Sequence, residues 1–517
     1  MNGFELERKR TLALLLRLGD RLEQGPLRQV YCNRDIQHQN VRWIGFDMDY
    51  TLAVYHREAF DKLSHSMVVD RLVERFGYAA DVADIPFRGD FAIRGLVGDR
   101  ETGHMLKVDA HRRVERGLHG LTPLSEEELS HYRMRPPILA SKRFYNMDTL
   151  FQLPEGYLFA AIIDLFEGRG ETVDYGKLAD DIRSSIDSIH GDGTLKKQIV
   201  ADLAKYIRHD RKLGDTLHRF RSAGKKLFLM TNSYFAYTEA VMTYLMDGGP
   251  SDYANWRGYF DVIVTGASKP SFFDGNAPFL ALSESGDVEG EERNAMKRGV
   301  CYQHGNLKDF ERMIGAQADE ILYVGDHIYG DILRSKRDSA WRTCMIVPEM
   351  EHELRVGREH AAQAKRWSAL ETELHTLADS LALGAELRLR YEEDADLLLH
   401  GMGSEVRAEV EEVLRASGRH TDQIRRRHRE IVQEIRELEK AVEDAHHPIW
   451  GPLFKAGNEN SSFGEQVENY SDLYTSRVTN FLAYSPTVEQ RAPRSRMPHE
   501  YVMLANASDD VPSDPKG

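Results

Sequence analysis

Residues 46–51 read Phe-Asp-Met-Asp-Tyr-Thr and directly follow an apolar run that starts at Val41. Side chains alternate along an extended segment, so Asp47 and Asp49 point to the same side at the end of this predicted strand. Two carboxylates this close repel one another, and a bound divalent cation would offset the repulsion. Mg²⁺ fits best, because hard cations prefer carboxylate oxygens. An acidic turn that caps a helix is the structural alternative.

Four more short apolar runs end, like the first, on small or polar residues. Together with Val41–Asp47 they are Lys226–Asn232, Phe260–Gly266, Ile321–Asp326 and Arg342–Pro348, and each is typical of a buried strand. Helical patterns such as Asp202–Ala223 and Lys308–Ile314 lie between them. Strands that alternate with helices predict an α/β fold with a parallel sheet covered on both faces. In such sheets the functional site lies at the carboxyl ends of the strands.

Polar residues stand at those ends in a definite order. Thr231, Asn232 and Ser233 close the second strand, Lys269 follows the third, and Asp326 and Asp331 follow the fourth. Each group alone has a common structural role, as a helix cap or as solvated surface. Together, however, they predict a single site, because an acid pair, a hydroxyl group, a lysine and a second acid pair would all lie at one edge of one sheet. Hydroxyl and backbone N–H groups there would bind a phosphate.

The spacing of the elements predicts several parts. About 180 residues separate the first two strands, far more than a helical crossover needs, so a second domain is expected there as a lid over the strand ends.

From Glu351 to His446 the chain has no proline and is rich in Glu, Arg, Ala and Leu. Apolar residues from Ile424 to Ala445 recur with heptad spacing, which predicts a hairpin within the chain, our preference, or a dimer contact. The expected division is 1–60 for the N-terminal segment and first strand, 61–200 for the inserted cap, 201–350 for the rest of the core, 351–490 for a helical appendage and 491–517 for a disordered tail.

Composition excludes several classes of function. The 517 residues carry a net charge of −15, which disfavours attraction of the whole surface to nucleic acid or to an anionic membrane. The basic run 425–429 is flanked by glutamates, so we interpret it as a solvated helix face. Three distant cysteines fit no zinc spacing and indicate a reducing compartment. With no secretory signal and no membrane-spanning stretch in sight, we expect a cytoplasmic protein.

Longer matches identify a family. FDMDYTLAVY (46–55), RFY (143–145), LF (150–151), LPE (153–155), Lys269-Pro270 and GDHIYGDIL (325–333) stand in order along the chain. These segments resemble the haloacid dehalogenase superfamily and, within it, the cytosolic purine 5′-nucleotidases of type II, which are specific for IMP and GMP. The resemblance implies a haloacid-dehalogenase-like Rossmannoid parallel sheet, an inserted cap domain and a helical C-terminal appendage. It also implies a homo-oligomer.

The resemblance assigns catalytic roles. Asp47 would attack phosphorus to form an aspartyl-phosphate, and Asp49 would act first as general acid and then as general base. Mg²⁺ would be held by the Asp47 carboxylate, the Asp49 backbone carbonyl and Asp326. Four further residues complete the implied machinery: Thr231 and Asn232 on the phosphate oxygens, Lys269 on the developing charge, and Asp331 orienting the lysine or a metal-bound water.

The resemblance also assigns the substrate-binding residues. Arg183 would reach the purine, Asp187 the ribose hydroxyls, and His190 with Phe151 would sandwich the base; Lys196 belongs to the same segment. Arg183 and Asp187 are four residues apart, so a surface ion pair is the structural alternative. Asp148 stands where the family has an asparagine. An ionised carboxylate only accepts hydrogen bonds, which suits guanine N1–H and N2–H₂ and favours GMP and IMP over AMP.

Alternatives remain at this stage. The core motifs alone permit a phosphatase for another phosphomonoester. A third hypothesis is a catalytically weak scaffold that binds nucleotides; the presence of both Asp47 and Asp49 argues against it. Phosphotransfer to a nucleoside would accompany hydrolysis if a nucleoside replaced water. At the family's regulatory nucleotide site Tyr329 and Arg337 match, whereas Ile138 and Asn469 stand where basic residues are expected, so activation by a polyphosphate is not predicted.

Overall fold

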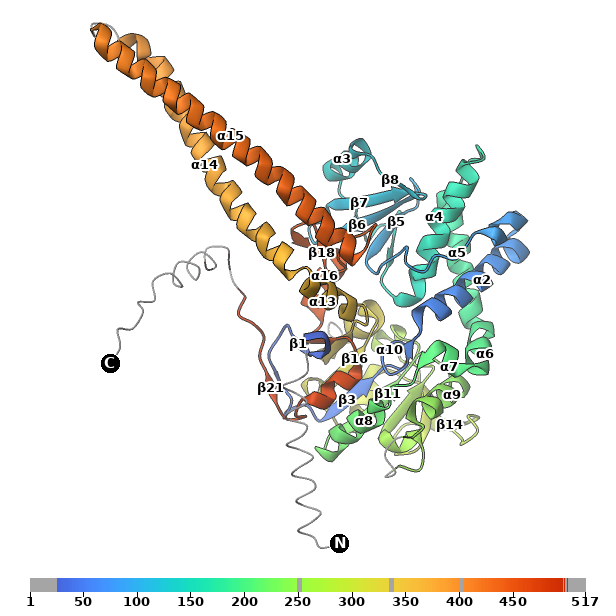
Figure 1. Cartoon of the computed structure of the whole chain (residues 1–517). Helices are drawn as coiled ribbons and strands as arrows, with labels where there is room; N and C mark the ends of the chain where they lie inside the picture. Colours follow the sequence, from blue (N-terminus) through green and yellow to red (C-terminus); the bar gives the residue numbers. More distant parts are fainter. Residues whose placement is uncertain are drawn as a thin grey trace, which may run out of the picture.

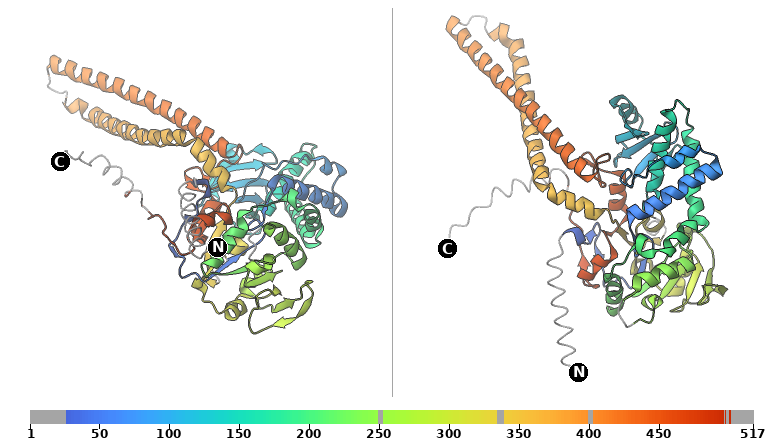
Figure 2. Two further views of the ribbon diagram at one scale, coloured as in Figure 1. Left: turned by 60° about the horizontal axis from the view of Figure 1, so that its bottom comes forward. Right: turned by 45° about the vertical axis from the view of Figure 1, so that its right-hand side comes forward.

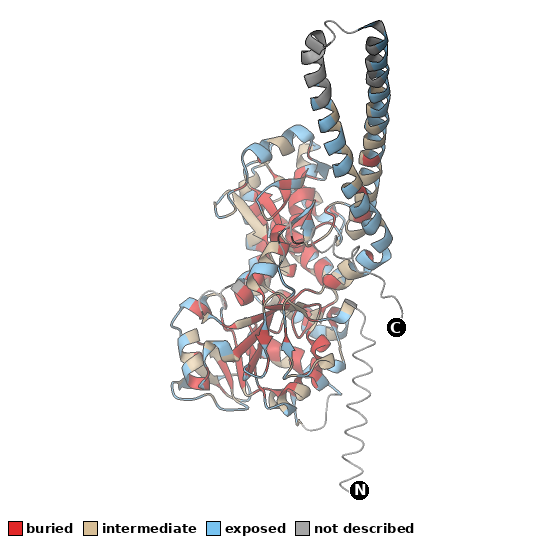
Figure 3. Cartoon of the chain, turned by 90° about the vertical axis from the view of Figure 1, so that its left-hand side faces the viewer, coloured by how far each residue is buried: buried red, intermediate tan, exposed pale blue. Residues whose placement is uncertain are grey.

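The computed structural model describes residues 26–248, 253–333, 339–398, 403–495, 497 and 500. Arg337 and most of the predicted disordered tail lie outside this part of the chain. The described residues form two lobes and a long helical hairpin (Figure 1). Buried residues occupy the interior of both lobes, whereas exposed ones follow the hairpin (Figure 3).

The five predicted strands are confirmed as neighbours in one sheet. They are β3 (Trp43–Phe46), β11 (Lys226–Met230), β12 (Val262–Thr265), β16 (Ile321–Gly325) and β17 (Arg342–Ile346). The order β17-β16-β3-β11-β12 is parallel at every step. The first strand of the core therefore lies in the middle, with later strands on both sides. This arrangement gathers the carboxyl ends of β3, β11, β12 and β16 at one edge.

The same sheet contains strands that the sequence did not reveal. Beyond β12 lie β15 (Cys301–His304), β13 (Phe279–Leu282) and β14 (Val288–Glu292); beyond β17 lie β20 (Leu473–Thr475) and β1 (Tyr31–Cys32). The pairing of β20 with β17 corrects the expectation that 351–490 is one helical appendage, because the chain returns to the core after the hairpin. The strands β20 and β1, of three and two residues, give too short an alternation to be recognised.

Between β3 and β11 the chain builds a second sheet. The antiparallel order is β8 (Thr122–Pro123), β7 (Val114–His119), β6 (His104–Val108), β5 (Leu96–Asp99) and β9 (Phe144–Met147). Helices α2 (Arg57–Phe76), α4 (Leu153–Glu167) and α5 (Tyr175–Gly191) pack against one another beside it. The most apolar window of the sequence is α4, which is buried in the core. Within the described ranges no helix has the length and apolar character that a membrane crossing requires.

One predicted helix is interrupted. The stretch 202–223 folds as α7 (Leu203–Tyr206), strand β10 (Ile207–Arg208) and α8 (Lys212–Ser222). Residues Ile207 and Arg208 pair antiparallel with Tyr55 and Val54 of β4 (Val54–Tyr55), which pulls the backbone out of the helix. This two-stranded ribbon lies close to the end of β3.

The heptad-patterned segment forms the hairpin within the chain. Helices α14 (Ala361–Leu398) and α15 (Ser404–His446) pack side by side and project away from both lobes (Figure 2). Leu370 and Ile431 are fully buried between them, and Arg366 and Arg427 form ion pairs across the hairpin with Glu434 and Glu373.

Candidate active site

A cluster of buried carboxylates surrounds one lysine at the carboxyl edge of the central sheet. Asp47 follows β3, and Asp326 and Asp331 follow β16; one oxygen from each lies within 4.8 Å of the other two. Nζ of Lys269 lies 2.9 Å from Asp47 Oδ1 and 2.6 Å from Asp331 Oδ1. The predicted contact between Asp331 and the lysine is therefore present. Lys269 also donates to the phenol of Tyr323, a residue that the sequence analysis missed.

The charges of this cluster are not balanced. Three carboxylates face one ammonium group, and burial, against the opposing effect of Lys269, raises the pKa of Asp47 to about 7. Burial and the neighbouring Asp331 and Asp47 raise the pKa of Asp326 well above its usual value. Burial lowers the pKa of Lys269, but Asp331 and Asp47 outweigh it and keep the lysine charged. A cation in the cluster would restore the charged carboxylates.

Asp326 provides the test of whether a metal ion fits here. Its Oδ2 is buried and has no hydrogen-bond partner among the residues that the structure describes. A buried carboxylate oxygen without a partner is costly unless a cation binds it. An all-oxygen donor set from Asp47, Asp326 and Asp331 suits Mg²⁺. Asp49 was expected to bind the metal through its backbone carbonyl, which leaves its carboxylate for other contacts.

Both carboxylate oxygens of Asp49 accept hydrogen bonds from hydroxyl groups. Tyr55 donates to Oδ1 at 2.6 Å, and Ser233 donates to Oδ2 at 2.7 Å. Tyr237 lies 2.7 Å from the phenolic oxygen of Tyr55, and Lys196 donates to Ser233 Oγ at 3.2 Å. Ser233 and Lys196, both expected at the substrate, thus also hold the predicted acid–base residue. Neither Tyr55 nor Tyr237 had a signal in the sequence beyond the family segment.

Thr231 and Asn232 differ in what their side chains can offer a phosphate. Oγ1 of Thr231 accepts from the N–H of Ser233, so its hydroxyl hydrogen can still be donated. The side-chain amide of Asn232 instead donates to the carbonyl of Lys269 and accepts from the N–H of Lys269, at 2.8 and 2.7 Å. Asn232 therefore positions the lysine. This contact uses one of its two amide hydrogens, so a hydrogen bond from Asn232 to a phosphate oxygen stays a prediction.

A cavity of about 860 Å³ opens beside this network. Its lining joins the inserted segment to the sheet edge, and it includes most of the predicted substrate residues: Phe151, Arg183, Asp187, His190, Lys196 and Asn232. Asp187 is exposed, and Arg183 pairs with the buried Glu155 at 2.9 Å in place of Asp187. The pair with Glu155 replaces the surface ion pair with Asp187 that was the structural alternative, and the predicted contacts of Arg183 and Asp187 with a nucleotide stay predictions.

Two substrate predictions are corrected by the geometry. Asp148 is not among the residues that line the cavity; Thr149 and Gln152 line it instead. The turn is closed by Gln152, which accepts from the N–H of Asp148, and burial raises the pKa of the Asp148 carboxyl to about 6. The second correction concerns Phe151 and His190, whose rings meet edge to face at 5.3 Å and 82°. A base cannot lie between rings this close, so the predicted sandwich would require one of them to move.

Comparison with known proteins shows the family of the chain. The model of the 5′ nucleotidase family matches residues 30–502, and the chain belongs to this family. It is 30% identical to the human 5′-nucleotidase domain-containing protein 2, over 91% of this chain and 85% of that protein. A 5′-nucleotidase domain-containing protein of Dictyostelium discoideum is 27% identical over 91% of this chain and 75% of its own length. Among solved structures, a HAD-hydrolase from Bacillus subtilis bound to magnesium matches 60% of this chain and 88% of its own, with 12% identity and a TM-score of 0.23.

Family and fold together define the class of enzyme. A parallel sheet with an aspartate pair at the end of its central strand, within a 5′ nucleotidase family chain, identifies a phosphoric monoester hydrolase.

Proposed function

We propose that this protein is a Mg²⁺-dependent 5′-nucleotidase that hydrolyses purine nucleoside 5′-monophosphates through an aspartyl-phosphate on Asp47. The observation that carries the proposal is the position of the 860 Å³ cavity, whose wall includes Asn232, directly beside the acids that would perform the chemistry. A nucleoside in the cavity would present its 5′-phosphate to Asp47. A scaffold that only binds nucleotides would not need the buried lysine and acid cluster.

The first half-reaction is the attack of an Asp47 oxygen on phosphorus. The bond between phosphorus and the ribose 5′-oxygen breaks, and Asp49 gives its proton to that oxygen. Tyr55 and Ser233 fix the orientation of the Asp49 carboxyl during the transfer. The free nucleoside leaves, and the phosphoryl group stays on Asp47.

The second half-reaction restores the enzyme. Asp49, now ionised, takes a proton from a water molecule whose oxygen attacks the phosphorus of the aspartyl-phosphate, and inorganic phosphate leaves. Lys269 and the Thr231 hydroxyl stabilise the charge on the phosphoryl oxygens in both steps. Mg²⁺, held by Asp47 and Asp326, would neutralise charge on the phosphate. A nucleoside hydroxyl in place of water would give phosphotransfer by the same route.

Purine specificity draws its support from the size of the cavity and from the aromatic wall at Phe151. The preference for GMP and IMP over AMP rested on a contact between Asp148 and the base. Asp148 is not among the residues that line the cavity, so this support is lost. The proposal therefore covers purine monophosphates as a class.

The test measures phosphate release from GMP, IMP, AMP, CMP and phosphosugars with Mg²⁺. The native chain should release phosphate from purine monophosphates, and Asp47→Asn should abolish release. Asp70→Asn, an exposed substitution of the same kind on α2, serves as the control and should retain full activity. Preferred hydrolysis of a phosphosugar would reject the nucleotidase and retain the phosphatase.

A further inference from the structure

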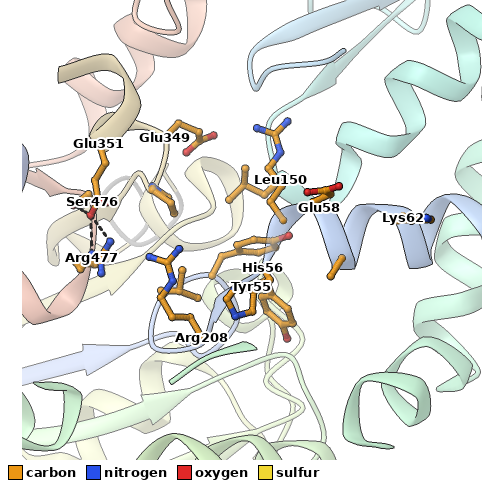
Figure 4. A pocket seen from close by; sticks show the side chains of 15 residues that line it. Tyr55, His56, Glu58, Lys62, Leu150, Arg208, Glu349, Glu351, Ser476 and Arg477 are labelled. Carbon is orange, nitrogen blue, oxygen red and sulfur yellow. Dashed lines mark hydrogen bonds and ion pairs between the residues drawn. The ribbon is translucent and has the colours of Figure 1, made fainter. Parts of the chain in front are cut away.

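A second cavity, of about 600 Å³, is lined by Tyr55, whose hydroxyl donates to Asp49. Three parts of the chain meet there: the ribbon of β4 and β10, the first turn of α2, and the loops around Pro348 and Ser476. Figure 4 shows Arg208, Glu349 and the Arg477–Glu351 pair on one side of this cavity and the α2 residues Glu58 and Lys62 on the other. The nucleotidase mechanism uses no residue of this cavity except Tyr55.

Most charges in the second cavity are already neutralised in pairs. Glu349 accepts two hydrogen bonds from Arg94, at 2.8 and 2.6 Å. Arg477 donates to Glu351 at 2.7 Å, and Arg57 lies 3.3 Å from Asp61. On α2, Glu58 and Lys62 are four residues apart, where opposite charges attract.

Arg208, by contrast with Arg57 and Arg477, has no such pair among the described residues. Its guanidinium has no ion-pair or hydrogen-bond partner within the described ranges, and β10 places it at the wall of the cavity. An arginine offers a rigid fork of N–H donors that matches the oxygens of a phosphate. The Arg208 guanidinium is therefore available to an anionic ligand in the cavity.

Two further donors belong to residues that line the same cavity. Helix α2, 20 residues long, begins in the cavity, and its N-cap residue His56 makes no side-chain capping bond. The N–H groups of its first turn are thus free to bind an anion. The hydroxyl of Tyr50, another lining residue, is buried and has no partner in the part of the chain that the structure describes. An unpaired buried hydroxyl indicates a missing ligand or water.

We propose that this second cavity binds a phosphate-bearing small molecule through Arg208, the first turn of α2 and the Tyr50 hydroxyl, and that its occupancy changes the turnover of the neighbouring active site. The route for coupling is short. Tyr55 lines the second cavity and donates to Asp49, while the ring of Tyr50 contacts Phe151, which lines the first cavity, at 4.8 Å. The binding stands by itself, whereas the effect on turnover rests on the proposed nucleotidase activity.

The binding is tested by equilibrium dialysis of the full chain with radiolabelled inorganic phosphate and Mg²⁺. Native protein should bind two equivalents, one at each site. Arg208→Gln should lose one of them, with a loss of affinity of about tenfold or more, because a hydrogen bond to a charged group is lost. Thr231→Val should lose the other. Arg211→Gln makes the same change of charge three residues away, outside the cavity lining, and should retain both. A single equivalent in the native chain, or two in R208Q, overturns the proposal.

The coupling is tested by initial rates of monophosphate hydrolysis against phosphate concentration. Phosphate at the active site competes with substrate and raises KM alone, whereas phosphate in the second cavity changes kcat. The kcat effect should vanish in R208Q and persist in R211Q. A native kcat that phosphate leaves unchanged overturns the coupling. A native chain that hydrolyses no monophosphate overturns the nucleotidase instead, and the dialysis still decides whether the second cavity binds phosphate.

Discussion

Tyr55 donates a hydrogen bond of 2.6 Å to Oδ1 of Asp49, and its phenolic oxygen lies 2.7 Å from that of Tyr237. The hydrogen of Tyr55 is committed to the carboxylate, so Tyr237 is the donor between the two phenols. This chain of hydroxyls comes from β4 and from α9 (Phe235–Met246), whereas Asp49 follows β3. Three elements thus fix one carboxylate in the orientation that an acid–base catalyst needs.

Removing the Tyr55 hydroxyl should slow turnover without weakening substrate binding. We expect Tyr55→Phe to reduce kcat about 10- to 100-fold, a part of what general acid–base catalysis provides, with KM unchanged. Tyr244→Phe removes a phenol on the same helix as Tyr237, whose hydrogen-bond partner among the described residues is the Ile207 carbonyl, and it should keep kcat. Steady-state kinetics on both variants decide the matter. An increase in KM at constant kcat would assign Tyr55 to substrate binding.

The unpartnered Asp326 oxygen leads to a prediction on metal binding. Without metal, the Asp326 carboxyl must either stay charged in a buried site or take up a proton, and both are unfavourable. Asp326→Asn avoids this cost, so the metal-free variant should melt at a higher temperature than the metal-free native chain. The same change should weaken Mg²⁺ binding by roughly 10- to 100-fold, as loss of a residue around a metal does. Thermal unfolding with and without Mg²⁺ measures both effects. Equal stabilisation of native protein and variant by Mg²⁺ would place the metal elsewhere.

The pair of Arg183 and Glu155 separates a structural role from a binding role. Arg183→Met leaves the Glu155 carboxylate, 2% exposed, without its partner. Breaking a buried pair costs about 3–5 kcal/mol, and because Arg183 is itself 33% exposed we expect about 2 kcal/mol in urea unfolding. The double variant with Glu155→Gln should regain stability. If the double variant is as stable as the native chain and still has a higher KM, Arg183 also contacts the nucleotide.

The strand-end residues could be predicted because a parallel sheet brings its carboxyl ends together whatever the loops do. Asp47, Thr231, Lys269 and Asp326 follow four adjacent strands, and order along the chain was sufficient to place them. Contacts made by side chains of distant elements were not predictable in this way. Tyr323 and Tyr55 look like ordinary strand residues in the sequence, and only the packing shows their hydroxyls at Lys269 and Asp49.

The predictions of side-chain contacts were wrong where a shift of one residue along the chain turns a side chain to another side. Asp148 precedes a turn of 3-10 helix capped by Thr149, so neighbours in sequence point to different sides, and a family alignment does not carry that direction. Arg183 illustrates a second limit. Helical spacing offered Asp187 as its partner, but Glu155 on α4 supplies a buried carboxylate, which attracts the guanidinium more strongly than an exposed one.

A buried acid away from the active site gives the pH prediction. Burial raises the pKa of Asp61, on α2, from 3.8 to about 7, against the opposing effect of Arg57, and its Oδ1 has no partner among the described residues. Between about pH 4 and about pH 7 the unfolded chain has lost this proton while the folded chain keeps it, so the free energy of unfolding falls as the pH rises. Asp61→Asn cannot ionise and should be more stable than the native chain by about 4 kcal/mol at pH 8, with little gain at pH 4. Urea midpoints at both pH values test this, with the exposed Asp70→Asn as the control that should change neither. A gain of equal size at both pH values would mean that Asp61 destabilises the fold by its shape and not by its charge.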